Sequence, residues 1–154
     1  MNRVIKTMLV TAAALIGTAV ALPAAAQFAK PEAAIKYRQS VMTVQSYHLG
    51  RVFAMTNGKV PFDAKAVATD ADVLLTVAQL PFVAFGEGTD KGDTKAQPKV
   101  WTDKDAFMAA ARKMQDEVAK LNVAAKGGNL DAIKVAAGDV GKACKACHDN
   151  FRKE

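Results

Sequence analysis

Hydrophobic residues recur at helical spacing from Glu32 to about Thr56, a stretch rich in helix formers. Pro31 stands where the first turn of a helix tolerates proline, and Asn57-Gly58 ends the stretch. With 3.6 residues per turn, one stripe of this stretch consists of Ile35, Arg38, Met42, Leu49 and Phe53. The stripe is apolar except for its arginine. The pattern therefore predicts a long first helix that buries one face.

A second helix is predicted from Asp63, whose side chain suits an N-cap, to Leu80, because Pro81 ends the pattern. An aromatic segment, residues 81–86, follows. From Gly86 to Pro98 the sequence has glycines, charges and no hydrophobic period. This stretch is predicted to be the one long loop, on the surface.

A third helix is predicted to begin at Thr102, which forms a capping-box pattern with Asp105, and to end at Gly127-Gly128. Its stripe is Phe107, Ala111, Met114, Val118, Leu121 and Ala125. A fourth helix, capped by Asn129 or Asp131, is predicted to run to the C-terminus. Its stripe is Ile133, Ala137, Val140, Cys144, Cys147, His148 and Phe151.

Four amphipathic helices without an alternating strand pattern predict an all-α fold, an antiparallel four-helix bundle. The chain has 154 residues, of which 51% are hydrophobic, so it is long enough for one core but hardly for two. We therefore expect a single domain.

The first 26 residues have the pattern of a secretory signal peptide. Residues 1–6 carry two positive charges and no acid, and an apolar stretch follows from Thr7 to Leu22. The small residues 24–26 form an A-x-A cleavage pattern, so residues 1–26 are predicted to be removed and residues 27–154 to form the mature domain. A membrane anchor is the alternative, but the apolar stretch is short for a membrane span. We expect no anchor.

The charge pattern adds little to this description. The formal net charge of +6 would fall to +4 on removal of the signal peptide, because Arg3 and Lys6 are the charged residues removed. Lysines and acids alternate through the rest of the chain without a basic run. A nucleic-acid partner is therefore not expected.

The chain has two cysteines, Cys144 and Cys147, and His148 follows the second directly. In an exported protein two cysteines usually suggest a disulfide, but the C-x-x-C-H spacing is typical of haem attachment. On a helix, Cys144 and Cys147 project from one face and can each form a thioether with a haem vinyl group, while His148 can bind the iron. A zinc site would need a fourth ligand, and His48 is the one other histidine. We predict one haem c.

Several segments resemble the class II c-type cytochromes, and within them the cytochromes c′. The resemblance runs along the whole of residues 27–154. It is carried by Lys36–Ser40, Gly50-Arg51, Gly58–Asp63, Leu80–Gly86, Val100–Asp103 and Gly138–His148. The resemblance implies a periplasmic four-helix bundle with a C-terminal haem, usually a homodimer packed through its first two helices.

The resemblance also implies a five-coordinate iron, with His148 on one side and an apolar pocket on the other. Met42 takes the first-helix position on the open side, and Phe82 and Phe85 line the pocket. Many relatives have leucine in place of Met42 and tryptophan in place of Phe82. Low-spin members of the class use a methionine four residues after an arginine as the sixth ligand, a spacing that Arg38 and Met42 match. Five-coordinate iron is our expectation, and Met42 ligation is the alternative.

Two arginines are expected near the haem. Arg38 interrupts an apolar stripe, and since a buried cation needs a partner, we expect a haem propionate there. The resemblance places Arg152, one turn beyond His148, beside the histidine face; an exposed terminal charge is the alternative. His48 is about 120° from the Met42 direction, so it is expected at the surface or in a dimer interface.

The leading hypothesis is a periplasmic haem protein that binds nitric oxide or carbon monoxide and exchanges electrons with an unidentified redox partner. The alternative is a low-spin electron carrier in which Met42 closes the iron to gases. A peroxidase would need an acid-base group over the iron, and Arg38 is the one candidate on the first-helix stripe. We therefore do not expect an enzyme.

Overall fold

The computed structural model describes residues 27–154, so the predicted signal peptide, residues 1–26, lies outside the described residues. Within 27–154 the long helices are α1 (Pro31–Thr56), α2 (Ala64–Val77), α4 (Lys104–Gly127) and α5 (Leu130–Phe151). Two short helices, the 3-10 helix η2 (Leu80–Ala84) and α3 (Lys99–Thr102), lie between α2 and α4.

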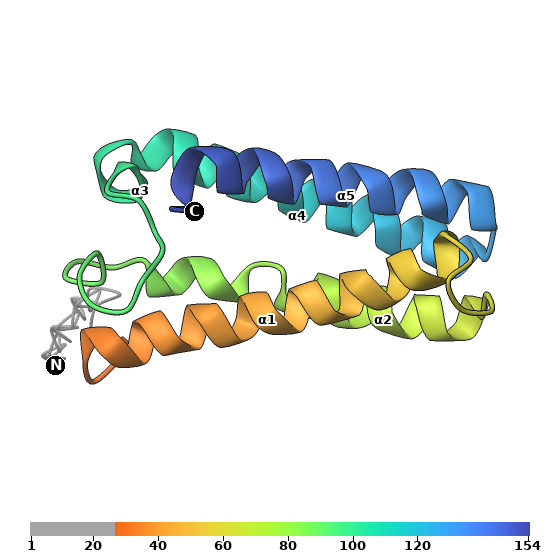
Figure 1. Cartoon of the computed structure of the whole chain (residues 1–154), viewed down its shortest axis with the longest axis horizontal. Coiled ribbons are helices and arrows are strands. Elements are labelled where there is room, and N and C mark those ends of the chain that lie inside the picture. Colours follow the sequence, from red (N-terminus) through yellow and green to blue (C-terminus); the bar gives the residue numbers. More distant parts are fainter. Residues whose placement is uncertain (1–26) are drawn as a thin grey trace, which may run out of the picture.

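The long helices form an antiparallel bundle of two hairpins, α1 with α2 and α4 with α5 (Figure 1). The α2 helix packs on α4 and α1 packs on α5, so the hairpins enclose one core. This arrangement confirms the predicted all-α four-helix bundle. The start of α1, the helix α3 and the C-terminus lie at the same end of the bundle (Figure 1).

Several helix ends are those that the sequence predicted. Asp63 caps α2, its carboxylate accepting hydrogen bonds from the backbone N–H groups of Lys65 and Ala66. Asn129 caps α5 in the same way, and Gly128 ends α4 at a φ of 69°, a conformation that costs glycine little. Local sequence chemistry therefore determines these ends.

Two predicted boundaries are wrong. The α2 helix ends at Val77 rather than Leu80, because Pro81 has no N–H to donate to the Val77 carbonyl oxygen, which accepts from the Gln45 side chain instead, and the chain continues as the 3-10 helix. The predicted capping box at Thr102 does not form, since Thr102 ends α3 and its hydroxyl donates to the Pro98 carbonyl oxygen. Asp103 stands at the N-cap of α4 without a side-chain cap bond.

The run Ala64–Ala84 is long and apolar enough to span a membrane by length and composition alone. Its α2 portion packs against α1 and α4, and Val67, Ala71 and Leu74 belong to the main core. This run is therefore explained as a core element of the bundle.

The helices α1 and α5 approach each other closely at Gly141. A Cβ atom placed on Gly141 would lie 3.0 Å from Cζ of Phe53 on α1. Gly141 is three residues before Cys144, and beyond it the space between the two helices holds cavities. The glycine thus sets the helix separation one turn before the cysteine motif.

Candidate haem site

Cys144, Cys147 and His148 lie on the last two turns of α5, whose final residue is Phe151. Positions three and four residues apart on a helix share one face, so these side chains are presented together. The two cysteines are half-buried and are not joined by a disulfide. The C-x-x-C-H motif is therefore held by a rigid element rather than by a loop.

Two adjoining cavities of about 570 and 300 Å³ lie beside this motif. Both are lined by Met42 and Ser46 of α1 and by Cys147 and His148 of α5. The larger one is lined by charged, polar and apolar side chains, among them Arg38, Phe85, Thr94, Lys95, Ala96, Phe107, Phe151 and Arg152. The smaller one is mainly apolar and includes Leu49, Phe53, Phe82, Met114 and Cys144. Their volumes are in the usual range for sites of small molecules and cofactors.

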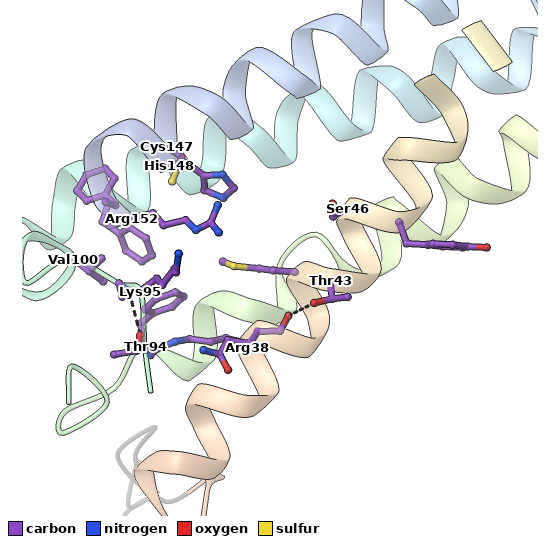
Figure 2. A pocket seen from close by; sticks show the side chains of 16 residues that line it. Arg38, Thr43, Ser46, Thr94, Lys95, Val100, Cys147, His148 and Arg152 are labelled. Carbon is purple, nitrogen blue, oxygen red and sulfur yellow. Dashed lines mark hydrogen bonds between the residues drawn. The ribbon is translucent and has the colours of Figure 1, made fainter. Parts of the chain in front are cut away.

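Figure 2 shows how three parts of the chain meet at the larger cavity. Cys147, His148 and Arg152 approach it from α5, and Arg38 and Thr43 approach from α1 on the other side. Thr94 and Lys95, from the segment between η2 and α3, lie between these two groups.

Partial burial disfavours the charged forms of the motif's reactive groups. It raises the pKa of both thiols, Cys144 and Cys147, and the thiolate form is correspondingly disfavoured. Burial is also the main cause that lowers the pKa of His148; the charge of Arg152 acts in the same direction and Asp149 opposes it. A neutral imidazole is the form that binds metals.

The charged side chains that line the cavities are cations, apart from the titratable His148. Arg38, Lys95 and Arg152 line the larger cavity, and no Asp or Glu lines either cavity within residues 27–154. A haem has a large apolar ring, two vinyl groups and two carboxylates. An apolar cavity with two thiols, an imidazole and a cationic margin fits that group.

Aromatic rings fill the space between this end of α5 and the rest of the bundle. Phe107 of α4 is central, with ring centroids 4.8 Å from Phe85, 5.3 Å from Phe151 and 5.8 Å from Phe82. The Trp101 indole donates a hydrogen bond of 3.1 Å to the Gly86 carbonyl oxygen. This cluster packs against the last turn of α5, and Trp101 anchors the loop at Gly86.

The structure gives Arg38 partners other than the expected haem propionate. Its side chain is 2% exposed, and its two terminal nitrogens donate hydrogen bonds to Ala84 O, Thr89 O, Thr89 Oγ1 and Thr94 Oγ1 at 2.7–2.9 Å. The guanidinium carbon lies 4.2 Å from the centre of the Phe85 ring. Burial lowers the pKa of Arg38 to about 10. The terminal nitrogens of Arg38 thus have neutral acceptors in the chain itself, and the expected contact of Arg38 with a haem propionate stays a prediction.

Loop 86–98 is only partly on the surface, which differs from the prediction. Thr89 is buried against Arg38, and at the other end of the loop Ala96 pairs with Arg152 in an isolated antiparallel bridge. The Lys153 N–H donates to Lys95 O at 2.7 Å, and the Gln97 N–H donates to Phe151 O at 2.9 Å. The loop thus joins α1 to the residues after the haem motif.

The remaining predicted residues lie as follows. Met42 lines both cavities, Phe85 lines the larger and Phe82 the smaller. His48 lines neither cavity; its Nδ1 lies 2.7 Å from Oδ1 of the buried Asp70 on α2. Thr94 and Lys95 line the larger cavity, but sequence reasoning missed them because a loop without a period gives no signal for which residues turn inward.

Comparisons with known proteins agree with this geometry. The family model described as Cytochrome C' matches residues 33–152. The cytochrome c' of Alcaligenes xylosoxydans xylosoxydans is 46% identical over 128 residues, which are 83% of this chain and 99% of that protein. The cytochrome c' of Rubrivivax gelatinosus is 50% identical over 129 residues, 83% of this chain and 100% of that protein.

Solved structures of the same two cytochromes have the same fold. The Rubrivivax gelatinosus structure matches with a TM-score of 0.80 and 51% identity, over 82% of this chain and 100% of that chain. A leucine-to-alanine variant of the Alcaligenes xylosoxidans protein, solved as its nitric oxide complex, matches with a TM-score of 0.78 and 45% identity, over 82% and 98%. A leucine-to-glycine variant has been solved with carbon monoxide bound, with the same TM-score and identity, over 82% and 99%.

The family model matches most of the described residues, and the relatives are near 50% identical. The solved structures have the same helical bundle, and this chain has C-x-x-C-H on its last helix. This chain belongs to the cytochrome c′ family, whose members carry a c-type haem.

Proposed function

We propose that this protein is a periplasmic haem protein that binds nitric oxide or carbon monoxide at a five-coordinate iron and can exchange electrons. The observation that carries the proposal is the position of His148 and Met42, from α5 and α1, as lining residues of the same two cavities. One wall thus offers a metal ligand and the other an apolar thioether side chain that need not bind the metal.

The chain's own residues would hold one haem as follows. Cys144 and Cys147 would each form a thioether with one vinyl group, and His148 would bind the iron. Arg38, Lys95 and Arg152 line the larger cavity and would supply the positive charge for the haem carboxylates. The iron supplies the site for the gas and for the electron.

The apolar lining on the α1 side supports a gas as the ligand. Met42, Leu49 and Phe53 of α1 offer no hydrogen-bond donor to a bound molecule, and the polar side chains of α1 that line the same cavity are Gln45 and Ser46. Such a pocket disfavours bound oxygen, which needs polar stabilisation, and admits neutral diatomic molecules. The nitric oxide and carbon monoxide complexes of the related Alcaligenes cytochrome are consistent with the same ligands here.

A low-spin electron carrier remains the second candidate because Met42 itself lines the cavities opposite His148. A thioether on the iron would raise the reduction potential and close the site to gases. This function requires Met42 to bind the iron, so it makes a different spectroscopic prediction.

The visible spectrum of the oxidised and reduced holoprotein, before and after carbon monoxide, separates the two functions. We expect high-spin bands that shift with carbon monoxide, and a Met42→Leu variant that keeps the high-spin spectrum. Sharp low-spin bands with no response to carbon monoxide, lost in Met42→Leu, would establish the electron carrier instead. Met108→Leu is the matched control, since Met108 lines neither cavity.

Export and assembly are part of the same proposal. The relatives are matched over 99–100% of their length by 83% of this chain, which is consistent with removal of residues 1–26 before the protein acts. The α1–α2 pair exposes Val44, Tyr47 and Leu75, which supports a homodimer packed through these helices. The periplasm is the compartment that the signal pattern and the haem motif favour together.

A further inference from the structure

We infer that Arg38 is a positioning residue for Arg152: through loop 86–98 it fixes the backbone that follows the haem motif. The inference rests on the proposed role of Arg152 as a cation at the haem cavity. It assigns Arg38, on α1, an effect on the opposite wall of the cavity, where α5 ends.

The first step is the anchoring of the loop by Arg38. Four hydrogen bonds run from its terminal nitrogens to acceptors at Ala84, Thr89 and Thr94, which are 46–56 residues away in the chain. Thr89 Oγ1 also donates to Gly86 O at 2.8 Å, so the hydroxyl is held from both sides. A planar guanidinium can hold several acceptors in one fixed geometry, which a lysine ammonium cannot.

The second step is the chain of hydrogen bonds that connects Thr94 to the C-terminal residues. Thr94 Oγ1 accepts from Arg38 at 2.8 Å and from the backbone N–H of Ala96 at 3.1 Å. Ala96 is the residue that pairs with Arg152, and the flanking bonds join Lys95 to Lys153 and Gln97 to Phe151. One threonine hydroxyl therefore connects the arginine of α1 to the strand-like pairing at the end of α5.

The third step concerns the hydrogen bonds of the last residues, 152–154. Arg152 is the C-cap of α5, and its backbone N–H bonds to His148 O at 3.0 Å. Beyond this bond, the described hydrogen bonds of residues 152–154 go to the loop, including one from the Gln97 side chain to Arg152 O. Short chain ends without tertiary contacts fray, so the loop is what orders these residues.

The test uses the haem-loaded protein with Arg38→Lys, which keeps the positive charge but loses the fork of donors. Hydrogen exchange at the Gln97 and Lys153 amides is expected to accelerate roughly tenfold or more, with the amides of the middle of α5 unchanged. Gln39→Ala is the matched control, because Gln39 is exposed and bonds the same loop at Asp93 O. It should leave both amides unaffected.

The reduction potential distinguishes positioning of Arg152 from a direct effect of Arg38 on the haem. If Arg38 acts through Arg152, Arg38→Lys shifts the potential in the parent but causes no further shift in an Arg152→Ala background. Equal shifts in both backgrounds, or unchanged exchange at Gln97 and Lys153, would overturn the inference. The potential can be measured whether or not Met42 binds the iron, so this outcome is independent of gas binding.

Thr94→Val is the second variant, for use if Arg38→Lys does not fold with haem. It keeps the side-chain volume and removes the acceptor that links Arg38 to Ala96. We expect the same faster hydrogen exchange at the Gln97 and Lys153 amides. In an Arg152→Ala background, Thr94→Val should cause no further shift in the reduction potential. A Thr94→Val protein with parental exchange at Lys153 would contradict the inference.

Discussion

At the scale of single residues, two of the charged side chains buried within residues 27–154 have contrasting partners. Arg38 has neutral oxygen partners and the face of an aromatic ring, whereas Glu117 on α4 accepts hydrogen bonds from Lys113 and Lys120. The Glu117 side chain is 7% exposed, and the two lysines are largely in solvent. The two ammonium groups lower the pKa of Glu117. Each buried charge is thus matched by several donors or acceptors.

The lowered pKa of Glu117 predicts a specific loss of stability in acid. A carboxyl with a folded pKa below its unfolded value stabilises the fold fully above the unfolded pKa. This contribution disappears as the pH falls through the folded pKa. Glu117→Gln should therefore be less stable than the parent near neutral pH, and the difference should shrink below about pH 4.

Urea unfolding of parent and variant across this pH range measures the effect. Glu87→Gln is the control, because Glu87 is exposed and lies in the loop. A difference between Glu117→Gln and the parent that stays constant with pH would contradict the assignment.

How far the sequence predicts single residues depends on how local their chemistry is. Cys144, Cys147 and His148 were predicted to share one helix face, since their spacing alone fixes it. The partners of Arg38 could not be predicted, because its acceptors are carbonyl and hydroxyl oxygens of a distant loop. Thr94 was missed for the same reason.

At the scale of the helices, the two N-caps of α2 and α4 are a natural contrast. Asp63 and Asp103 are both aspartates at N-cap positions, but Asp63 bonds two backbone N–H groups and Asp103 bonds none through its side chain. The preceding α3 places Asp103 at φ −130° and ψ 58°, outside the extended geometry of Asp63. The residue type alone does not make a cap.

Substitution of these two aspartates tests that contrast. Asp63→Ala is expected to lower the free energy of unfolding by about 1 kcal/mol, because two N–H groups lose their acceptor. Asp103→Ala should change it by a few tenths of that amount. Thermal or urea unfolding measures both, and equal losses would show that the caps are equivalent after all.

The glycines of α5 provide a second test at this scale. Gly141 faces Phe53 of α1 at close range, whereas a Cβ on Gly138 would meet nothing within 4 Å. Gly138→Ala should stabilise the helix by about 0.5–1 kcal/mol. Gly141→Ala gains the same propensity but must displace a ring packed on the core, so it should be less stable than Gly138→Ala by about 1–3 kcal/mol.

The measurement for this pair is the urea midpoint of each holoprotein, with the haem spectrum recorded alongside. Gly141→Ala should also perturb the spectrum, since Gly141 lies one turn before Cys144. If the two alanine variants were equally stable, the close approach of α1 and α5 would not be a constraint.

The order and type of the four long helices were predicted from the sequence because their hydrophobic stripes are long and periodic. The end of α2 and the start of α4 were predicted less well. At α2 a 3-10 helix forms before the chain leaves the bundle, and at α4 the extra turn of α3 takes the residues of the expected capping box. Short non-α turns of this kind have no period to reveal them.

At the scale of the whole molecule, the α1–α2 pair exposes apolar side chains, and one of them, Tyr47, also lines the larger cavity. Tyr47 and Val44 of α1 are 62% and 40% exposed, and Leu75 of α2 is 42% exposed. On the same pair of helices, the buried Asp70 accepts hydrogen bonds from His48 and Arg51. This face is where we propose that a second copy packs.

Leu75→Lys tests the proposed homodimer, because Leu75 is exposed on α2 and lines neither cavity. The lysine removes apolar area from this face and adds a charge to it, so the variant should be monomeric at concentrations where the parent is dimeric. Val123→Lys is the control, because Val123 is 73% exposed on α4. Sedimentation velocity distinguishes the outcomes, and a parent that sediments as a monomer would refute the dimer.

The intact mass of the exported protein tests the central claim, a single haem held covalently on α5. We expect the mass of residues 27–154 plus one haem, and the haem should stay on the chain through acid-acetone extraction. When Cys144 and Cys147 are both replaced by serine, the mass should be that of the chain without haem. A chain that carries no haem after extraction, with both thiols free, would contradict the account.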